Sequence, residues 1–264
     1  MKEHVPIGID GEGYTDIKGR HRYTFMSACT ADAQVDELYS SRGLRAEEVF
    51  DWFLGLPKGL LVGFFLGYDR TMWWRTLPNE TIYALTHPEP TGRYAGRMGR
   101  NGPRAVFWEG YALNLVGGRF SVRGPHHETS KLTTRTVWDL SKFYQCAFVK
   151  ALRLWGVGSE QEVARIERMK RKRGDFARIG PREQAYCRSE CMLLAQLTGK
   201  LITAHADVGL PLRSFFGPGS TASEMLAQMG AEGQKARVPK RMARAVDCAF
   251  FGGRFEHSRV GVVR

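Results

Sequence analysis

The chain has 264 residues, of which 43% are hydrophobic and 25% are charged. This composition is typical of soluble globular proteins and excludes collagen-like, coiled-coil and intrinsically disordered chains. Lys and Arg (39) outnumber Asp and Glu (27), and the formal net charge of +12 favours a polyanionic partner such as nucleic acid, although many basic proteins have no such partner.

The cysteines and the N-terminus indicate a cytoplasmic protein. The five cysteines are scattered and odd in number, which fits a reducing compartment better than a disulfide framework. Cys187 and Cys191 lie one helical turn apart without a second pair at zinc-finger spacing, so we expect buried thiols there rather than zinc. The N-terminal segment has no apolar core of a signal peptide, and no apolar run is long enough to span a membrane.

Hydrophobic periodicity predicts the following elements in the first half of the chain: strands over 4–10 and 21–29, a helix over 44–54, a strand buried on both faces over 60–66, a short helix over 71–77, a loop over 86–103, and two or three strands over 105–122 that turn at Gly117-Gly118. In the second half it predicts a strand over 133–138 and helices over 140–155, 160–171, 181–204 and 221–229. Early strands followed by helices favour an α/β or α+β fold around a mixed sheet.

Two carboxylates close the first predicted strand. Asp10 and Glu12 are alternate residues of an extended segment, so both can face one point in space. Adjacent carboxylates repel each other unless a cation lies between them, and oxygen ligands select Mg²⁺ or Mn²⁺. The alternative is a solvated turn, because Asp-Gly is a common turn dipeptide.

Three further residues extend this acidic set. Asp69 follows the buried strand, where α/β proteins often place functional groups, although it would equally suit a helix N-cap. Tyr186 and Glu190 are four residues apart on one face of a predicted helix. A phenol beside a metal-bound carboxylate can orient a water molecule; the alternative is an amphipathic helix with an exposed acid.

The order of these motifs resembles a known family. The pattern DxE, then GYD after an apolar strand, then YxxxE resembles the 3′–5′ exonuclease domain of family B DNA polymerases, and is most similar to the bacteriophage, plasmid and organellar branch, many of whose members are protein-primed. Five segments carry the resemblance, in this order: IGIDGEGY, VGFFLGYD, TVWDLSKFYQCAFVKAL, YCRSECMLLAQL and AFFGGRFE.

The resemblance implies an α/β, ribonuclease-H-like (DnaQ-like) fold with a central mixed sheet flanked by helices. It places the exonuclease domain at 1–205 and a connecting segment at 206–264, leading toward a polymerase palm that this chain lacks. The implied activity is proofreading: removal of nucleotides from single-stranded or frayed 3′ ends of DNA, without polymerisation by this chain alone. A phage-encoded chain would act in the host cytoplasm, with primer-template DNA and a separate polymerase module as partners.

The resemblance also implies a catalytic set of Asp10, Glu12, Asp69, Tyr186 and Glu190 around two Mg²⁺ or Mn²⁺ ions. Asp10 would bridge both metals, Glu12 and Glu190 would hold the metal that carries the nucleophilic water, and Asp69 would hold the other. Tyr186 would orient that water. The four carboxylates are the metal ligands in this reading, and which acid holds which metal is left open.

Expected DNA contacts come from three places. Residues 150–178 are strongly basic, and Lys170 and Lys172 are the candidates for a lysine that contacts the scissile phosphate, as the resemblance implies; a solvated helix end is the alternative. Phe176 and Tyr68 are candidates for stacking on a base, with core packing as the alternative. By resemblance to the family's YxGG-type motif, the last group contacts the template: Gly252, Gly253 and Arg254.

Three departures from the family pattern affect the interpretation. Glu190 stands where the family has Asp, Phe65 where it often has a polar residue such as Asn, and Gly13 where the protein-primed branch often has Thr. Two alternatives therefore stay open. One is a non-catalytic DNA-binding or assembly part of a split or truncated polymerase, and the other is a free-standing nuclease of the same fold that acts on RNA.

Overall fold

The computed structural model describes residues 5–87, 98–99, 102–103, 105–126, 129–231, 239 and 242. The chain divides into two compact units, Met1–Thr221 and Ala222–Arg264, and the site lies wholly within the first. The domain boundary expected at 205/206 stays a prediction. Among the described residues, no helix combines the length and the apolar character needed to cross a membrane.

A mixed sheet of eight strands forms the centre of the first unit, in the order β3-β2-β1-β4-β10-β9-β8-β7. Its strands are β1 (Pro6–Thr15), β2 (His21–Cys29), β3 (Gln34–Tyr39), β4 (Leu60–Gly63), β7 (Val106–Trp108), β8 (Tyr111–Val116), β9 (Arg119–Pro125) and β10 (Leu132–Asp139); β5 (Met98–Gly99) and β6 (Gly102–Pro103) form a separate pair. β1, β2 and β3 are antiparallel, β4 and β10 run parallel to β1, and β9 to β7 return antiparallel. This α/β arrangement confirms the predicted ribonuclease-H-like fold class.

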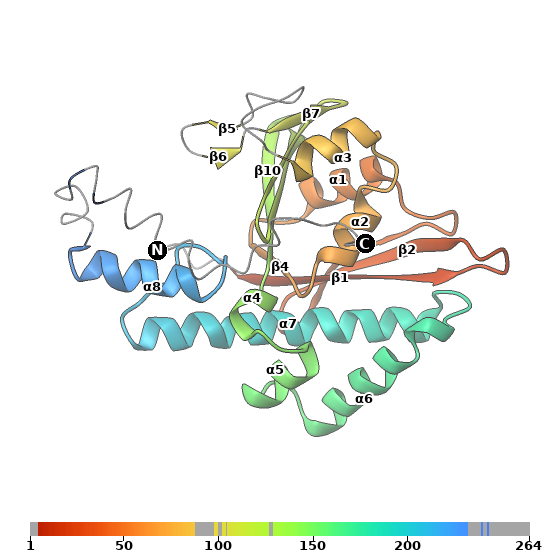
Figure 1. Cartoon of the computed structure of the whole chain (residues 1–264). Coiled ribbons are helices and arrows are strands. Elements are labelled where there is room, and N and C mark those ends of the chain that lie inside the picture. Colours follow the sequence, from red (N-terminus) through yellow and green to blue (C-terminus); the bar gives the residue numbers. More distant parts are fainter. Residues whose placement is uncertain are drawn as a thin grey trace, which may run out of the picture. The chain divides into compact units, whose positions relative to one another are not determined.

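Helices cover both faces of this sheet (Figure 1). They are α1 (Ala46–Gly55), α2 (Gly67–Trp73), α3 (Asn79–Thr86), α4 (Ser141–Tyr144), α5 (Phe148–Leu154), α6 (Glu160–Arg171), the 3₁₀ turn η1 (Arg173–Asp175) and α7 (Pro181–Asp207). A further helix, α8 (Pro218–Gln228), spans the boundary between the two units. The long helix α7 packs on β1, β2 and β4, with α5 and α6 beyond it, while α1 packs on β9 and β10. Two buried apolar clusters fill the spaces between these layers.

The close contact between α7 and β1 depends on a glycine. A Cβ atom at Gly8 would lie 2.1 Å from the carbonyl oxygen of Cys191 on α7. Since that oxygen belongs to the backbone of a rigid helix, no side chain can be added at Gly8 without moving α7 away from the strand. Gly8 is two residues before Asp10, and Cys191 directly follows Glu190. The contact between Gly8 and Cys191 therefore sets the distance between these two acids.

The sequence predicted some element bounds correctly and missed others. β2 and α6 have the predicted bounds, and Ser159 and Glu162 explain the start of α6, because they exchange the hydrogen bonds of a capping box. The helix predicted over 140–155 is wrong: it is broken at Gln145, which adopts a left-handed backbone with φ 50°. The sequence analysis did not predict β3 or α3.

Two corrections concern the acidic residues directly. β1 continues to Thr15, so Asp10 and Glu12 lie within the strand rather than at its end. β4 ends at Gly63, earlier than predicted, and α2 begins at Gly67, so Asp69 is a helical residue and not the N-cap of a helix over 71–77.

We expect Gly8→Ala to lower the free energy of unfolding by about 2 kcal/mol, because overpacking of a core typically costs about 1–3 kcal/mol. Gly199→Ala is the matched control, since Gly199 lies within α7 and a Cβ atom there would meet no atom within 4 Å. This control variant should match or exceed the stability of the wild type, because alanine is the better helix former. Urea unfolding midpoints with unchanged m-values measure both effects. A Gly8→Ala variant as stable as Gly199→Ala would show that α7 is not held this tightly against β1.

Candidate metal-binding and catalytic site

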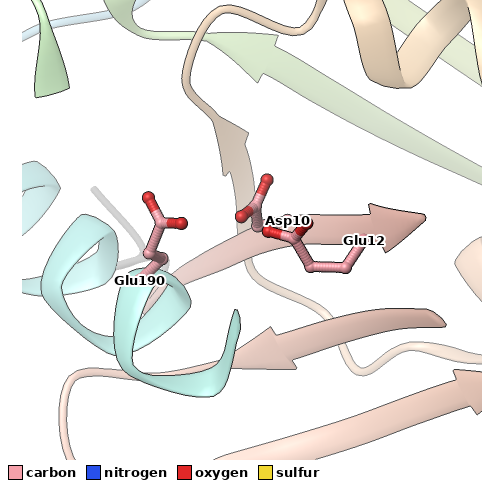
Figure 2. Close-up of side chains that lie close together, drawn as sticks. All are labelled: Asp10, Glu12 and Glu190. Atoms are coloured by element: carbon pink, nitrogen blue, oxygen red, sulfur yellow. The ribbon is translucent and has the colours of Figure 1, made fainter. Parts of the chain in front are cut away.

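Three carboxylates from two elements meet where α7 crosses β1. Asp10 and Glu12 are alternate residues of β1, and Glu190 reaches them from the middle of α7 (Figure 2). One oxygen of each side chain lies within 4.8 Å of those of the other two. Glu12 and Glu190 are 2% and 4% exposed, so water does not screen their charges. This spacing of oxygen ligands can hold a metal ion.

The fourth carboxylate, Asp69, is buried on α2 and faces the same cleft. The Tyr23 hydroxyl donates a hydrogen bond of 2.9 Å to its Oδ1, and the Trp73 indole N–H donates to the Tyr23 hydroxyl at 3.3 Å. Gly11 makes room for this arrangement, because a Cβ atom there would lie 1.8 Å from the Tyr23 hydroxyl oxygen. Asp69 is therefore fixed in orientation by a chain of hydrogen bonds from the sheet.

A second aspartate holds the turn that leads into α2. The Asp139 carboxylate at the end of β10 accepts hydrogen bonds from the backbone amides of Phe65 (3.0 Å), Leu66 (3.2 Å) and Ser141 (3.0 Å). Phe65 adopts a left-handed backbone with φ 58°, which is uncommon for an aromatic residue. Asp139 thus stabilises a strained turn and acts as a positioning residue for Asp69.

Three of the four carboxylates, those of Asp10, Asp69 and Glu190, line a cleft of about 350 Å³, and Glu12 lies next to Asp10 and Glu190. The rings of Phe65 and Tyr68 line the cleft and are 57% and 44% exposed. Tyr186 is fully buried behind the cleft, one turn before Glu190, and its hydroxyl has no hydrogen-bond partner among the described residues. A buried hydroxyl without a protein partner can donate a hydrogen bond to a water molecule or to a ligand.

Two basic side chains lie among the acids. Arg173 from η1 donates through Nε to Glu12 (2.9 Å) and through Nη2 to Glu12 (2.5 Å) and Asp10 (3.2 Å); Nη2 is also 3.6 Å from Glu190. Lys170 Nζ lies 2.5 Å from the other Glu190 oxygen. The guanidinium therefore contacts the same three carboxylates that could hold a metal ion, and a cation bound to all three would displace it.

Burial makes these acids reluctant to ionise. It raises the pKa of Asp10 well above its usual range, and the Glu190 carboxylate raises it further. Burial likewise raises the pKa of Glu12 to about 7, although Arg173 opposes the shift. The pKa of Asp69 rises to about 6 for the same reason, against the hydrogen bond from Tyr23. Each raised pKa means that the folded protein favours a bound proton or another cation at this site.

The pKa values of the basic and phenolic groups are raised as well. Burial alone would lower the pKa of Arg173, but the carboxylates of Asp10 and Glu12 outweigh it and hold the pKa above its usual range. Burial and the nearby Glu190 raise the pKa of Tyr186, so its hydroxyl keeps its proton. Arg173 is therefore a permanent cation in the site, and Tyr186 a permanent hydrogen-bond donor.

The residues present fit a divalent cation. Glu190 Oε2 is buried without a hydrogen bond among the described residues, and so is the Tyr186 hydroxyl. These two atoms, together with Asp10 and Glu12, supply hard oxygen ligands and a donor for metal-bound water.

Of the predicted residues, Asp10, Asp69, Glu190, Lys170 and Tyr68 line one cleft. Glu12 lies within 4.8 Å of Asp10 and Glu190, and the ring of Tyr186 lies beneath the Arg173 guanidinium. Lys172 is exposed and lies apart from the acids, at a separate hollow beside Arg178. Phe176 is 9% exposed and packs in the core under α7, so little of its ring is free for a base. Gly252, Gly253 and Arg254 lie outside the described residues.

Three residues that shape the site were not predicted from the sequence: Arg173, Asp139 and Tyr23. The exposure of the Phe65 ring was not predicted either. Arg173 was visible only as one member of the run Lys170-Arg171-Lys172-Arg173, where helical phase cannot distinguish a residue beyond the end of α6. Asp139 follows directly after a predicted strand, and this position could have identified it as a candidate functional residue.

Solved structures provide distant likenesses. Phi29 DNA polymerase complexed with primer-template DNA and incoming nucleotide substrates is 11% identical with a TM-score of 0.46; the match covers 87% of this chain and 35% of that chain. A structure described as the apo form of the nuclease is 14% identical with a TM-score of 0.38, covering 97% of this chain and 91% of that chain. The chain thus spans about a third of the polymerase's length. No family model and no curated protein matches the sequence.

The metal-free protein should lose stability as the pH rises. The Glu12 carboxyl has a pKa of about 7 in the folded protein and an ordinary value of 4.5, so between these values the folded state binds a proton that the unfolded state has released. In EDTA, we expect the free energy of unfolding to fall by on the order of 2 kcal/mol from about pH 5 to about pH 8. Urea unfolding at each pH measures this slope, and Glu12→Gln should flatten it. A stability that rises over this range in EDTA would contradict the account.

Proposed function

We propose that the chain is a metal-dependent 3′–5′ exonuclease domain that removes nucleotides from single-stranded or frayed 3′ ends of DNA. One observation carries the proposal: three carboxylates from β1, α2 and α7 line one cleft, and a fourth, Glu12, lies within 4.8 Å of two of them. The buried Tyr186 hydroxyl, which has no hydrogen-bond partner among the described residues, lies one helical turn from Glu190. The resemblance of the sequence motifs to family B polymerases supports the direction of cleavage and a proofreading role.

Hydrolysis of a phosphodiester needs an activated water and neutralisation of the charge that develops on the phosphate. Two Mg²⁺ or Mn²⁺ ions would supply the nucleophilic hydroxide and this neutralisation when bound. In the proposal, Asp10 lies between the two cation positions, with Glu12 and Glu190 at one and Asp69 at the other.

The remaining groups have roles that the geometry favours. The protonated Tyr186 hydroxyl, one helical turn from Glu190, would donate to or orient the attacking water. Lys170 and Arg173, once released from the carboxylates, would neutralise a phosphate oxygen, because both are tethered at the cleft. The exposed rings of Phe65 and Tyr68 offer faces on which the terminal base would stack.

A second function is favoured by a specific observation. Arg173 and Lys170 already neutralise part of the acidic charge, so the chain would remain a folded DNA-binding or assembly module even if its site took up no metal. In that case the glutamate at 190 would mark a site that has lost catalysis. Cleavage in the presence of metal separates the two functions.

The purified chain with Mg²⁺ or Mn²⁺ should shorten a 5′-labelled single-stranded DNA stepwise from its 3′ end, and EDTA should stop the reaction. Asp10→Ala should abolish cleavage, and Glu190→Ala should slow it at least about 100-fold, or about 2.7 kcal/mol of barrier. Glu190→Asp should retain activity. Asp207→Ala is the matched control, because it removes an exposed acid from the same helix and should leave the rate within about twofold.

Tyr186→Phe distinguishes a functional hydroxyl from a structural one. Because that hydroxyl has no partner among the described residues, its removal should not reduce the free energy of unfolding, whereas the cleavage rate should fall. An unchanged rate in Tyr186→Phe and Glu190→Ala would contradict the assigned site. No cleavage by the wild type with either metal would favour the non-catalytic module, and preference for a matched RNA strand would favour the ribonuclease alternative.

A further inference from the structure

A second, basic hollow lies near the acidic cleft. It has a volume of about 240 Å³ and is lined by Arg20, His21, Arg22, Tyr23, Arg42, Gly43, Leu44, Arg45, Arg75 and Thr76. These residues come from β2 and the turn before it, from the segment between β3 and α1, and from the segment that follows α2. No acidic side chain is among them, in the part of the chain that the structure describes.

The charges in this hollow are only partly neutralised. Arg20 and Arg22 share one carboxylate, that of Asp16, with Nε–Oδ2 distances of 3.1 Å each. Arg45 pairs with Glu47 at 3.1 Å. Only two carboxylates therefore pair with the five arginines, and the hollow keeps a net positive charge.

Arg42 and Arg75 account for most of that excess charge. Neither has an acidic partner among the described residues, and both are exposed. Arg75 donates to the backbone carbonyl of His21, and the carbonyl of Arg42 accepts a hydrogen bond of 3.0 Å from Arg22. The backbone on both sides of the hollow is thus held by the arginines themselves, while the Arg42 side chain and the other Arg75 nitrogens stay free for a ligand.

The hollow and the acidic cleft share a wall. Tyr23 lines the hollow, and its hydroxyl donates to Asp69 in the cleft. His21 also lines the hollow, and its Nε2 contacts the hydroxyl of Tyr68, which lines the cleft. The rings of His21 and Tyr23 both pack edge-on against Tyr68. A strand that leaves the cleft past Tyr68 would therefore reach the arginines directly.

We propose that this hollow binds the sugar-phosphate backbone of a nucleic-acid strand whose 3′ end lies in the acidic cleft. Guanidinium groups match phosphate oxygens with paired hydrogen bonds, and a row of them tracks a backbone without reading its sequence. The choice of nucleic acid over other polyanions rests on the proposed function. The hollow adds a binding segment upstream of the terminal nucleotides, so affinity depends on the length of the strand.

Fluorescence anisotropy with labelled oligothymidylates of about 4 and about 12 nucleotides tests this proposal, with Ca²⁺ or EDTA present to prevent cleavage. The full chain carrying Arg42→Gln and Arg75→Gln should bind the longer strand about tenfold more weakly and the shorter strand as the wild type does. The slope of log affinity against log salt for the longer strand should flatten by about 1.4, or about 0.7 for each lost phosphate contact. Arg42→Gln alone, at an exposed side chain, should give about half of this change in slope.

Arg123→Gln with Lys131→Gln is the matched control. It removes the same charge from β9 and the segment before β10, in the other half of the sheet, and should leave binding unchanged. Equal loss in both double variants would mean that only net charge matters, and an unchanged affinity in Arg42→Gln/Arg75→Gln would place the strand elsewhere; either result overturns the proposal. Competition with inorganic phosphate gives a further test. If phosphate abolishes the binding of the short and the long strand equally, the hollow is a site for free phosphate, and this result also overturns the proposal. Cleavage of the short strand by the Arg42/Arg75 variant tests the proposed function separately.

Discussion

The mutual repulsion of buried carboxylates is the constraint on which the rest of this structure depends. Asp10, Glu12 and Glu190 lie within 4.8 Å of one another in a place that water does not screen, and Asp69 faces the same cleft. Such a cluster persists only if cations or protons neutralise it. Arg173 and Lys170 provide that neutralisation within the chain itself. The cleft is thus a place where positive charge is required and where a phosphate, once metal is present, would be attracted.

The fold brings the acids together through close backbone contacts. Gly8 allows α7 to lie directly on β1, and this contact places Glu190 opposite Asp10. Gly11 gives room to the Tyr23 hydroxyl, which orients Asp69, and Asp139 fastens the turn before α2. Each acid is therefore held by a strand or a helix rather than by a loop. The backbone positions of the acids are thus set by the fold itself.

Patterns local in sequence predicted the fold class and the acids, whereas contacts distant in sequence escaped prediction. Hydrophobic patterning predicted the bounds of β2 and α6, and strand periodicity placed Asp10 and Glu12 on one face. The early end of β4 was missed because the turn that follows it is held by hydrogen bonds from Phe65 and Leu66 to Asp139, which is distant in sequence. The break at Gln145 was missed because the hydrophobic pattern continues across this left-handed residue. Arg173 could not be distinguished from its basic neighbours, because only the 3₁₀ turn after α6 directs it inward.

The most direct test of this account is the affinity of the metal-free protein for Mn²⁺, followed by the loss of the free-ion signal in electron paramagnetic resonance. If Asp10, Glu12 and Glu190 form a cation site that Arg173 fills in the absence of metal, Arg173→Ala should bind Mn²⁺ at least about tenfold more tightly than the wild type, because a competing positive charge is removed. Arg171→Ala, two residues away and paired with Glu167 on the surface, should bind like the wild type. Equal or weaker binding by Arg173→Ala would contradict the account.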